Sequence, residues 1–457
     1  MDTNRIAVVG GGLAGCECAL RLARAGFFVT IFEQKPEYRS PAHVSDALAE
    51  LVCSNSLRSD EPTSGVGLLK AEMRRLGSDF MAVADACRVP AGKALAVDRE
   101  AFAAAMTARV RQHARITLVG RRITGLDDAA LAGFEHIVIA AGPLASEDLS
   151  ASLGAALGAE HCYFYDAIAP IVWTHSLDMS VVFRASRYGC DNGEEPGQGD
   201  YLNCPMNREE YERFYQALLD ARKVEAHAFE REKHFEGCMP VEALAERGPR
   251  TLTFGPLKPV GFIDPRTGRR PWAVLQLRAE QANTETCNLV GCQTKLTQPE
   301  QARVFRLVPG LERAEFARFG SMHRNTYVNA PEVLDADLSL RARPNLFLAG
   351  QITGVEGYVE SAACGLWLGL SLAARLRGEA LPPLPQECAL GALLQHLQTP
   401  AKHFQPSNVH FGLMPELGEK ARKKDRKALY AARACAAFAR WLESPSVCRL
   451  REYCAQP

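Results

Sequence analysis

Hydrophobic and polar positions at the start of the chain follow two different periods. Apolar runs at 5–9 and 28–32 predict two short buried strands, and the small and apolar residues between them, up to about Gly26, predict a helix. Strand, tight turn, helix and strand in this order form a βαβ unit with parallel strands. The beginning of the chain therefore predicts an α/β fold.

The turn between the first strand and the helix has the sequence Gly10-Gly11-Gly12-Leu13-Ala14-Gly15, which matches the dinucleotide-binding pattern G-x-G-x-x-G. Gly10 permits the tight turn, Gly12 lets a pyrophosphate approach the backbone, and Gly15 allows the helix to pack closely on the strand. The helix N-terminus offers its N–H groups to the phosphates. Glu33, at the end of the second strand, is placed to accept a ribose hydroxyl. A glycine turn that binds nothing is the alternative, and the strand, helix and acid around it argue against that.

A second glycine junction occurs far along the chain. An apolar strand predicted at 345–349 leads through Gly350-Gln351-Ile352-Thr353-Gly354 into a helix predicted at 359–376, whose N-terminus could face an electron-rich ring. A strand predicted at 136–140 also ends in a glycine turn, Ala141-Gly142-Pro143. Junctions so far apart in the chain predict one flavin domain that is interrupted by an insertion.

We therefore predict an α/β protein with a Rossmann-type FAD-binding domain, glutathione-reductase-like, interrupted by a smaller α/β insertion domain. Residues 1–185 and 318–457 are expected to form the FAD-binding domain, and residues 186–317 the insertion. The insertion contains an amphipathic helix predicted at 209–222 and basic residues scattered between Arg247 and Arg270.

Charge and cysteine content narrow the class of protein. Lys+Arg and Asp+Glu both number 53, so no global field attracts nucleic acid, and any such binding must come from local patches. No apolar run reaches the length of a membrane span, and the first residues lack a signal peptide, so we expect a cytoplasmic protein without membrane contact. The 15 cysteines contain no C-x-x-C pair, which favours free thiols in a reducing compartment and predicts no metal site.

Two cysteines have unusual neighbours. Cys53 lies where an apolar turn breaks into serine and asparagine, close to Arg58, and Cys238 follows Gly237 with His234 upstream. A thiol that attacks a substrate needs access and a lowered pKa, which nearby bases and an irregular loop provide. Most cysteines are inert small hydrophobic residues, so the residues alone leave both interpretations open.

Ordered sequence blocks along nearly the whole chain resemble the TrmFO family, the folate- and FAD-dependent tRNA (uracil-5-)-methyltransferases. The blocks are 10–15, 41–43, 50–59, 66–75, 90–99, 165–170, 201–206, Phe235-Glu-Gly-Cys-Met-Pro240, Phe254-Gly-Pro-Leu-Lys-Pro-Val-Gly261, 322–327, 350–361 and 404–406. Cys292 departs from the family pattern, which has an aromatic residue there, and it could alter folate binding or packing of the insertion.

The resemblance implies methylation of uracil C5 at the T-loop uridine, position 54, of tRNA. FAD, 5,10-methylenetetrahydrofolate as carbon donor and NAD(P)H as reductant are the implied cofactor and co-substrates. By similarity, Cys238 attacks uracil C6, and Cys53 removes the C5 proton or shields the flavin. Glu356 and Tyr358, just after Gly354, are expected to line the flavin–folate space, with ordinary helix-start packing as the equal alternative.

Contacts with the tRNA T-arm are expected on the insertion and its rim. Arg303 and Arg306 are spaced i, i+3 on a predicted helix, and His323, Arg324 and Asn325 precede a strand-like run. Arginines that grip phosphates would offset the cost of extruding a stacked base. A surface ion pair is the more common role of a single arginine.

The chain also has a basic cluster near its C-terminus, which is more often a solvated helix face than a nucleic-acid contact. Its members are Lys420, Arg422, Lys423, Lys424, Arg426 and Lys427.

Two other functions fit the same residues. One is C5 methylation of a ribosomal RNA uridine by the same chemistry, and the other is an NAD(P)H–flavin oxidoreductase without an RNA substrate. A tRNA wobble-uridine modification protein of similar fold has a long C-terminal helical domain, for which this chain lacks room. No motif distinguishes NADH from NADPH or indicates an oligomeric state.

Overall fold

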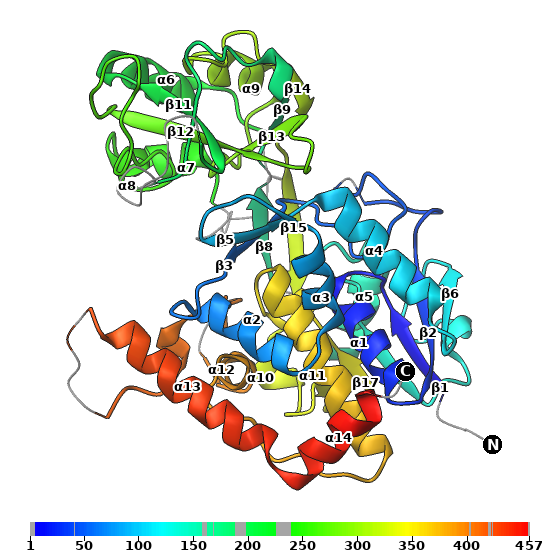
Figure 1. The fold of residues 1–457 in the computed structure, drawn as a ribbon. Helices are drawn as coiled ribbons and strands as arrows, with labels where there is room; N and C mark the ends of the chain where they lie inside the picture. Colours follow the sequence, from blue (N-terminus) through cyan, green and yellow to red (C-terminus); the bar gives the residue numbers. More distant parts are fainter. Residues whose placement is uncertain are drawn as a thin grey trace.

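The computed structural model describes residues 5–40, 42–157, 162–167, 169–187, 198–224, 239–401, 404–418, 422 and 424–455. They form a larger body that contains both ends of the described chain and a smaller body beside it (Figure 1). Two strands that run between the bodies, β8 (Cys162–Ala167) and β15 (Met322–Tyr327), pair antiparallel and connect them.

A six-stranded sheet in the order β16-β17-β7-β1-β2-β6 organises the larger body. The strands are β1 (Arg5–Val9), β2 (Phe28–Glu33), β6 (Ile116–Gly120), β7 (His136–Ile139), β16 (Ser339–Leu340) and β17 (Arg343–Leu348). All neighbours pair in parallel except β16 and β17. Because β17 lies beside β7 although the insertion separates them in the chain, the predicted Rossmann-type domain with an interruption is confirmed.

The helices of the larger body pack on this sheet or on one another. They are α1 (Leu13–Arg24), α2 (Gly65–Arg75), α3 (Asp79–Ala86), α4 (Arg99–Gln112), α5 (Glu147–Leu157), α10 (Ala330–Val333), α11 (Tyr358–Leu376), α12 (Ala389–His396), α13 (Arg426–Leu442) and α14 (Pro445–Ala455). A small sheet, β3 (Ser56–Ser59), β5 (Ala94–Val97) and β4 (Arg88–Val89), lies at the side of the insertion.

Helices α1 and α11 pack against each other at glycines. A Cβ on Gly365 would lie 2.2 Å from the Ala14 carbonyl oxygen, and one on Gly369 would lie 2.8 Å from Cβ of Arg21. This close crossing brings together the N-termini of α1 and α11, each of which follows a glycine junction. Among the described helices, α11 alone is long and apolar enough to cross a membrane, but 83% of that stretch is buried in the protein. It is a core helix.

The smaller body is built on a second six-stranded sheet, in the order β10-β11-β12-β13-β9-β14. The strands are β9 (Ile171–Trp173), β10 (Phe183–Ala185), β11 (Tyr201–Met206), β12 (Ala273–Ala279), β13 (Thr286–Leu289) and β14 (Phe316–Arg318), and the helices are α6 (Arg208–Asp220), α7 (Val241–Glu246), α8 (Thr251–Phe254) and α9 (Gln298–Phe305). Strands β9 and β10 precede residue 186, the expected start of the insertion. They nevertheless belong to the sheet of the insertion, because their hydrogen-bond partners are the later strands β11, β13 and β14.

Candidate cofactor and thiol site

A cleft opens at the carboxyl ends of the parallel strands β1, β2, β7 and β17. The space inside it, including the part open to solvent, is about 1040 Å³. Its walls include the turn after β1, Glu33 at the end of β2, the 140–146 turn after β7, Gly350 after β17, and Tyr358 of α11. Ligands of open α/β sheets bind at this edge.

The three glycines of the first turn differ in what they permit. Gly10 has φ +108°, and a Cβ there would lie 2.5 Å from the Ala140 oxygen, while a Cβ on Gly15 would lie 1.9 Å from the Gly10 oxygen. Both are therefore required by the fold. Gly12 is the N-cap of α1 with φ −77°, and no protein atom lies within 4 Å of its ideal Cβ. The protein itself has room for a side chain at Gly12, in front of a helix N-terminus that lines the cleft.

Glu33 is held at the cleft wall by its own chain. Its Oε2 accepts the Gly11 N–H at 2.7 Å, and its Oε1 accepts the Lys35 N–H at 3.0 Å. Each carboxylate oxygen has a further acceptor position. Glu33 therefore combines a fixed orientation with the capacity to accept hydroxyl groups from a bound ribose.

The second glycine junction divides into a part at the cleft and a part behind it. Gly350, φ +80°, and Tyr358 line the cleft. Gly354, φ +98°, packs against the Phe404 ring, which lies 2.5 Å from its ideal Cβ. Glu356 is 4% exposed, and its carboxylate accepts a hydrogen bond from Gln351 Nε2 at 2.5 Å. Neither Gly354 nor Glu356 belongs to the cleft wall, so of the pair expected there, Tyr358 lies at the cleft.

Tyr358 also contacts Cys53, which lies 305 positions away in the chain. Its hydroxyl oxygen accepts the backbone N–H groups of Cys53, at 2.7 Å, and Ser54, at 3.3 Å, and lies 2.8 Å from Cys53 Sγ. With both lone pairs accepting N–H groups, the hydroxyl proton is directed at the sulfur. Burial raises the pKa of Tyr358 well above its usual value, so the tyrosine remains a donor to Cys53.

Side chains of the insertion hold the loop that carries Cys53. Asn55 is completely buried and donates to the carbonyls of Val97 (3.0 Å) and Ala279 (2.9 Å). Arg278 of β12 donates to Asn55 Oδ1 and to Ser54 Oγ, both at 2.8 Å. The loop therefore depends on both bodies for its position. Sequence reasoning missed Asn55 and Arg278; the signal available was a charged residue inside the apolar run that forms β12.

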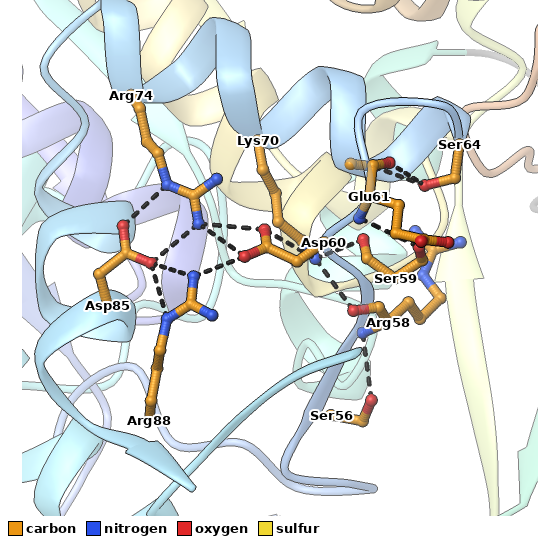
Figure 2. Close-up of polar contacts among 11 residues, drawn as sticks. Ser56, Arg58, Ser59, Asp60, Glu61, Ser64, Lys70, Arg74, Asp85 and Arg88 are labelled. Atoms are coloured by element: carbon orange, nitrogen blue, oxygen red, sulfur yellow. Dashed lines mark hydrogen bonds and ion pairs between the residues drawn. The ribbon is translucent and has the colours of Figure 1, made fainter. Parts of the chain in front are cut away.

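Behind this loop, a network of charged side chains holds strand β3 (Figure 2). Lys70 of α2 is completely buried and donates to the carbonyls of Arg58 (3.0 Å) and Ser59 (2.7 Å). Arg58 adopts φ +62°, a strained value for arginine, and its guanidinium pairs with the buried Glu360 in the first turn of α11. Lys70 thus helps to hold the backbone of β3, which follows Cys53 in the sequence and pairs through Arg58 with the first turn of α11.

The outer part of the same network is a set of ion pairs between two aspartates and two arginines. Asp60 and Asp85 each pair with both Arg74 and Arg88 (Figure 2). Together they connect α2, α3 and β4 around β3.

Replacing Lys70 by methionine is expected to remove a pH dependence of stability. Burial lowers the pKa of Lys70 from 10.5 to about 7, so between these pH values the unfolded chain binds a proton that the folded protein does not. Stability therefore rises with pH over this range, by up to about 1.4 kcal/mol per pH unit. Denaturant unfolding of wild type and Lys70→Met across the range measures the difference in slope. The exposed Lys93→Met is the matched control, and equal slopes for wild type and Lys70→Met would contradict the assignment.

Other predicted residues lie elsewhere. Cys238 lies outside the described residues. Cys292 is completely buried in the core of the insertion. Arg303 of α9 pairs with Glu300, and Arg306, the C-cap of α9, donates to the Ala314 carbonyl at 2.9 Å.

The segment expected to precede a strand-like run is part of a strand itself. His323, Arg324 and Asn325 all lie within β15, and the side chains of His323 and Arg324 are outside the described set. Asn325 is 2% exposed and so does not present its amide to a partner at the surface.

The predicted basic cluster lies at the start of α13 as far as it is described. Arg422, Lys424, Arg426 and Lys427 are exposed, and Arg422 pairs with Asp425 at 2.9 Å. Lys420 and Lys423 lie outside the described residues. The eleven cysteines whose state the structure describes are all free thiols.

Known proteins share this sequence over nearly its whole length. Residues 5–380 match the family described as "Glucose inhibited division protein A". The chain is 65% identical over 442 residues to the methylenetetrahydrofolate–tRNA-(uracil-5-)-methyltransferase TrmFO of Nitratidesulfovibrio vulgaris Hildenborough, covering 96% of this chain and 92% of that protein. It is 66% identical over 435 residues to the TrmFO of Oleidesulfovibrio alaskensis, covering 95% and 96%, respectively.

A solved structure shares the fold at low sequence identity. GidA of Aquifex aeolicus, in its form II crystal, superposes with a TM-score of 0.67 at 16% identity, over 99% of this chain and 76% of that one. The fold, the cleft and the long, highly identical relatives agree, and the chain belongs to the TrmFO family.

Proposed function

We propose that this protein methylates C5 of the T-loop uridine at position 54 of tRNA, with FAD as cofactor, 5,10-methylenetetrahydrofolate as carbon donor and NAD(P)H as reductant. The relatives' shared name supports the substrate, the reaction and the folate. The observation that carries the proposal is one continuous cleft whose wall includes the Gly12 turn and Glu33 at one part and Tyr358, in contact with Cys53, at another.

The residues of the cleft fit FAD. The open space at the ideal Cβ of Gly12, in front of the N-terminus of α1, suits a pyrophosphate. Glu33 suits the adenosine ribose, and Gly350 and Tyr358 would lie beside the flavin half. When bound, FAD would carry the one-carbon unit from the folate and supply the electrons that complete the methyl group.

The protein's own thiols would activate the uracil, which is a poor nucleophile at C5. In the proposed reaction the Cys238 thiolate adds to C6, so that electron density moves to C5, and C5 forms a bond to the one-carbon unit as the bond between that unit and its carrier breaks. A base then removes the C5 proton and the C6–S bond breaks to release the thiolate, and two electrons, which NAD(P)H would supply through bound FAD, reduce the one-carbon unit on C5 to the methyl group of the product. We assign the proton removal to Cys53, because the Tyr358 hydroxyl is directed at its sulfur and would stabilise a thiolate there.

The test follows the carbon and the covalent bond separately. Purified protein with FAD, NAD(P)H and labelled methylenetetrahydrofolate is expected to label transcribed tRNA at position 54 and to release tritium from C5-labelled uracil. Transfer from labelled S-adenosylmethionine instead, or labelling of ribosomal RNA alone, would refute the proposal.

Transcripts with 5-fluorouridine test the covalent bond. They are expected to trap an adduct with the wild type, and Cys238→Ala is expected to abolish this adduct while FAD stays bound. An adduct in Cys238→Ala would contradict its assigned role.

A further inference from the structure

One surface segment of the insertion has a charge balance unlike the rest of the chain. Residues 247–272 contain six basic residues and one acid, although the whole chain has 53 of each kind. The basic residues are Arg247, Arg250, Lys258, Arg266, Arg269 and Arg270. We call this segment the 247–272 surface.

These charges face solvent. All five arginines of the segment are exposed, and Lys258 is half-exposed. The single acid, Asp264, is 4% exposed and pairs with Arg266 at 2.9 Å. Within the segment itself, basic residues therefore outnumber acidic ones, and such a surplus of positive charge attracts polyanions such as RNA.

The same surface exposes two large aromatic residues. Phe254, the last residue of α8, is 71% exposed, and Trp272, just before β12, is 39% exposed. Arg250 lies over the Phe254 ring, 5.1 Å from its centroid, and Arg208 lies over the Trp272 ring at 5.4 Å. Exposed aromatic rings are platforms on which proteins stack unpaired bases, and arginine adds cation–π contacts.

Backbone hydrogen bonds attach the chain near both aromatic residues to the sheet of the insertion. The Val274 N–H donates to the Leu257 carbonyl at 3.1 Å, so the segment after Phe254 runs against the start of β12. The Trp272 N–H donates to the Met206 carbonyl at 2.9 Å. Helices α7 and α8 lie at the edge of the insertion on the side of the larger body (Figure 1), and α7 begins three residues after Cys238 in the sequence.

We propose that the 247–272 surface binds the unpaired loop nucleotides of the RNA substrate, with its guanidinium groups on phosphates and with bases stacked on Phe254 and Trp272. This inference rests on the proposed function. The 247–272 surface is a different set of residues from the arginines expected from the sequence, Arg303 and Arg306, which contact Glu300 and the Ala314 carbonyl. A loop is the occupant, since stacking requires bases that are not already paired in a duplex.

The test measures RNA affinity as a function of salt with the full-length holoenzyme. A T-arm hairpin transcript is the probe, and a duplex with the same stem but no loop is its comparison. Arg269→Gln with Arg270→Gln is expected to reduce the slope of log K against log[salt] by about one unit for each phosphate contact removed. Phe254→Leu and Trp272→Leu are each expected to weaken hairpin binding about tenfold, with the salt slope and duplex binding unchanged.

Matched controls come from other exposed positions. Arg303→Gln removes an exposed, ion-paired arginine, and Phe28→Leu removes a ring that is 54% exposed on the larger body; both should bind as wild type. Hairpin affinities of Phe254→Leu and Trp272→Leu equal to wild type would overturn the proposal, as would equal losses on the duplex. Methylation of tRNA by the wild type, measured in parallel, shows separately whether the proposed function itself holds.

Discussion

Replacing Gly12 by aspartate is expected to abolish FAD binding without destabilising the protein that lacks the flavin. Gly12 is the N-cap of α1 with φ −77°, and no protein atom lies within 4 Å of its ideal Cβ. Aspartate is a preferred N-cap residue, so the helix loses nothing. Its carboxylate would stand where the pyrophosphate binds, and repulsion in this partly buried cleft should raise the FAD dissociation constant at least ~100-fold, or about 3 kcal/mol.

Flavin fluorescence titration of the apoprotein and its thermal unfolding measure the two effects. Gly12→Asn is the matched control, because asparagine also caps the helix but carries no charge, and it should bind FAD more tightly than Gly12→Asp. Gly15→Ala provides the contrast: its Cβ would lie 1.9 Å from the Gly10 oxygen, so it should destabilise the apoprotein itself. Full FAD affinity in Gly12→Asp would place the pyrophosphate elsewhere.

The sequence predicts the larger body well because its signals are local. The turn at 10–15 and the apolar strands on both sides of it determine β1, α1 and β2 within a few positions, and the junction at Gly350 determines β17 and α11 in the same way. The start of the insertion was harder to predict. Strands β9 and β10 are three residues each and carry no periodicity of their own, and their membership in the second sheet comes from pairing with distant strands.

The sequence predicts individual residues of the site but not which of them lie in contact. Cys53 and Tyr358 both stood out in the sequence, yet nothing local indicates that a hydroxyl and a thiol 305 positions apart lie in contact. The buried Arg278 is a similar case, because its partners Asn55 and Ser54 belong to the other body. Hydrogen bonds of this kind join residues that are far apart in the sequence, so the three-dimensional structure is needed to show them.

The contacts around Cys53 also suggest why the insertion is needed at the cleft. Arg278 of β12 fixes Asn55 and Ser54, and Arg318 of β14 donates to the Val52 carbonyl at 3.2 Å. Lys70 and Arg58 fix the other end of the same loop on the larger body. These hydrogen bonds make the position of Cys53 depend on the placement of the insertion, which under our proposal also binds the RNA substrate.

Removing the Tyr358 hydroxyl is expected to raise the pH at which Cys53 becomes reactive, and removing the Cys53 sulfur to abolish methylation. Tyr358→Phe keeps the ring but deletes the proton directed at Cys53 Sγ, so a thiolate there loses its donor. Iodoacetamide alkylation of Cys53, followed by peptide mass spectrometry across pH, should show its midpoint displaced upward, with methylation reduced about tenfold to a hundredfold. Cys53→Ala should lower methylation at least ~1,000-fold while FAD and tRNA remain bound.

Cys87→Ala, which removes a half-buried thiol elsewhere in the protein, is the control for both measurements. An unchanged alkylation profile in Tyr358→Phe, or methylation at the wild-type rate in Cys53→Ala, would show that the thiol–hydroxyl contact serves packing alone.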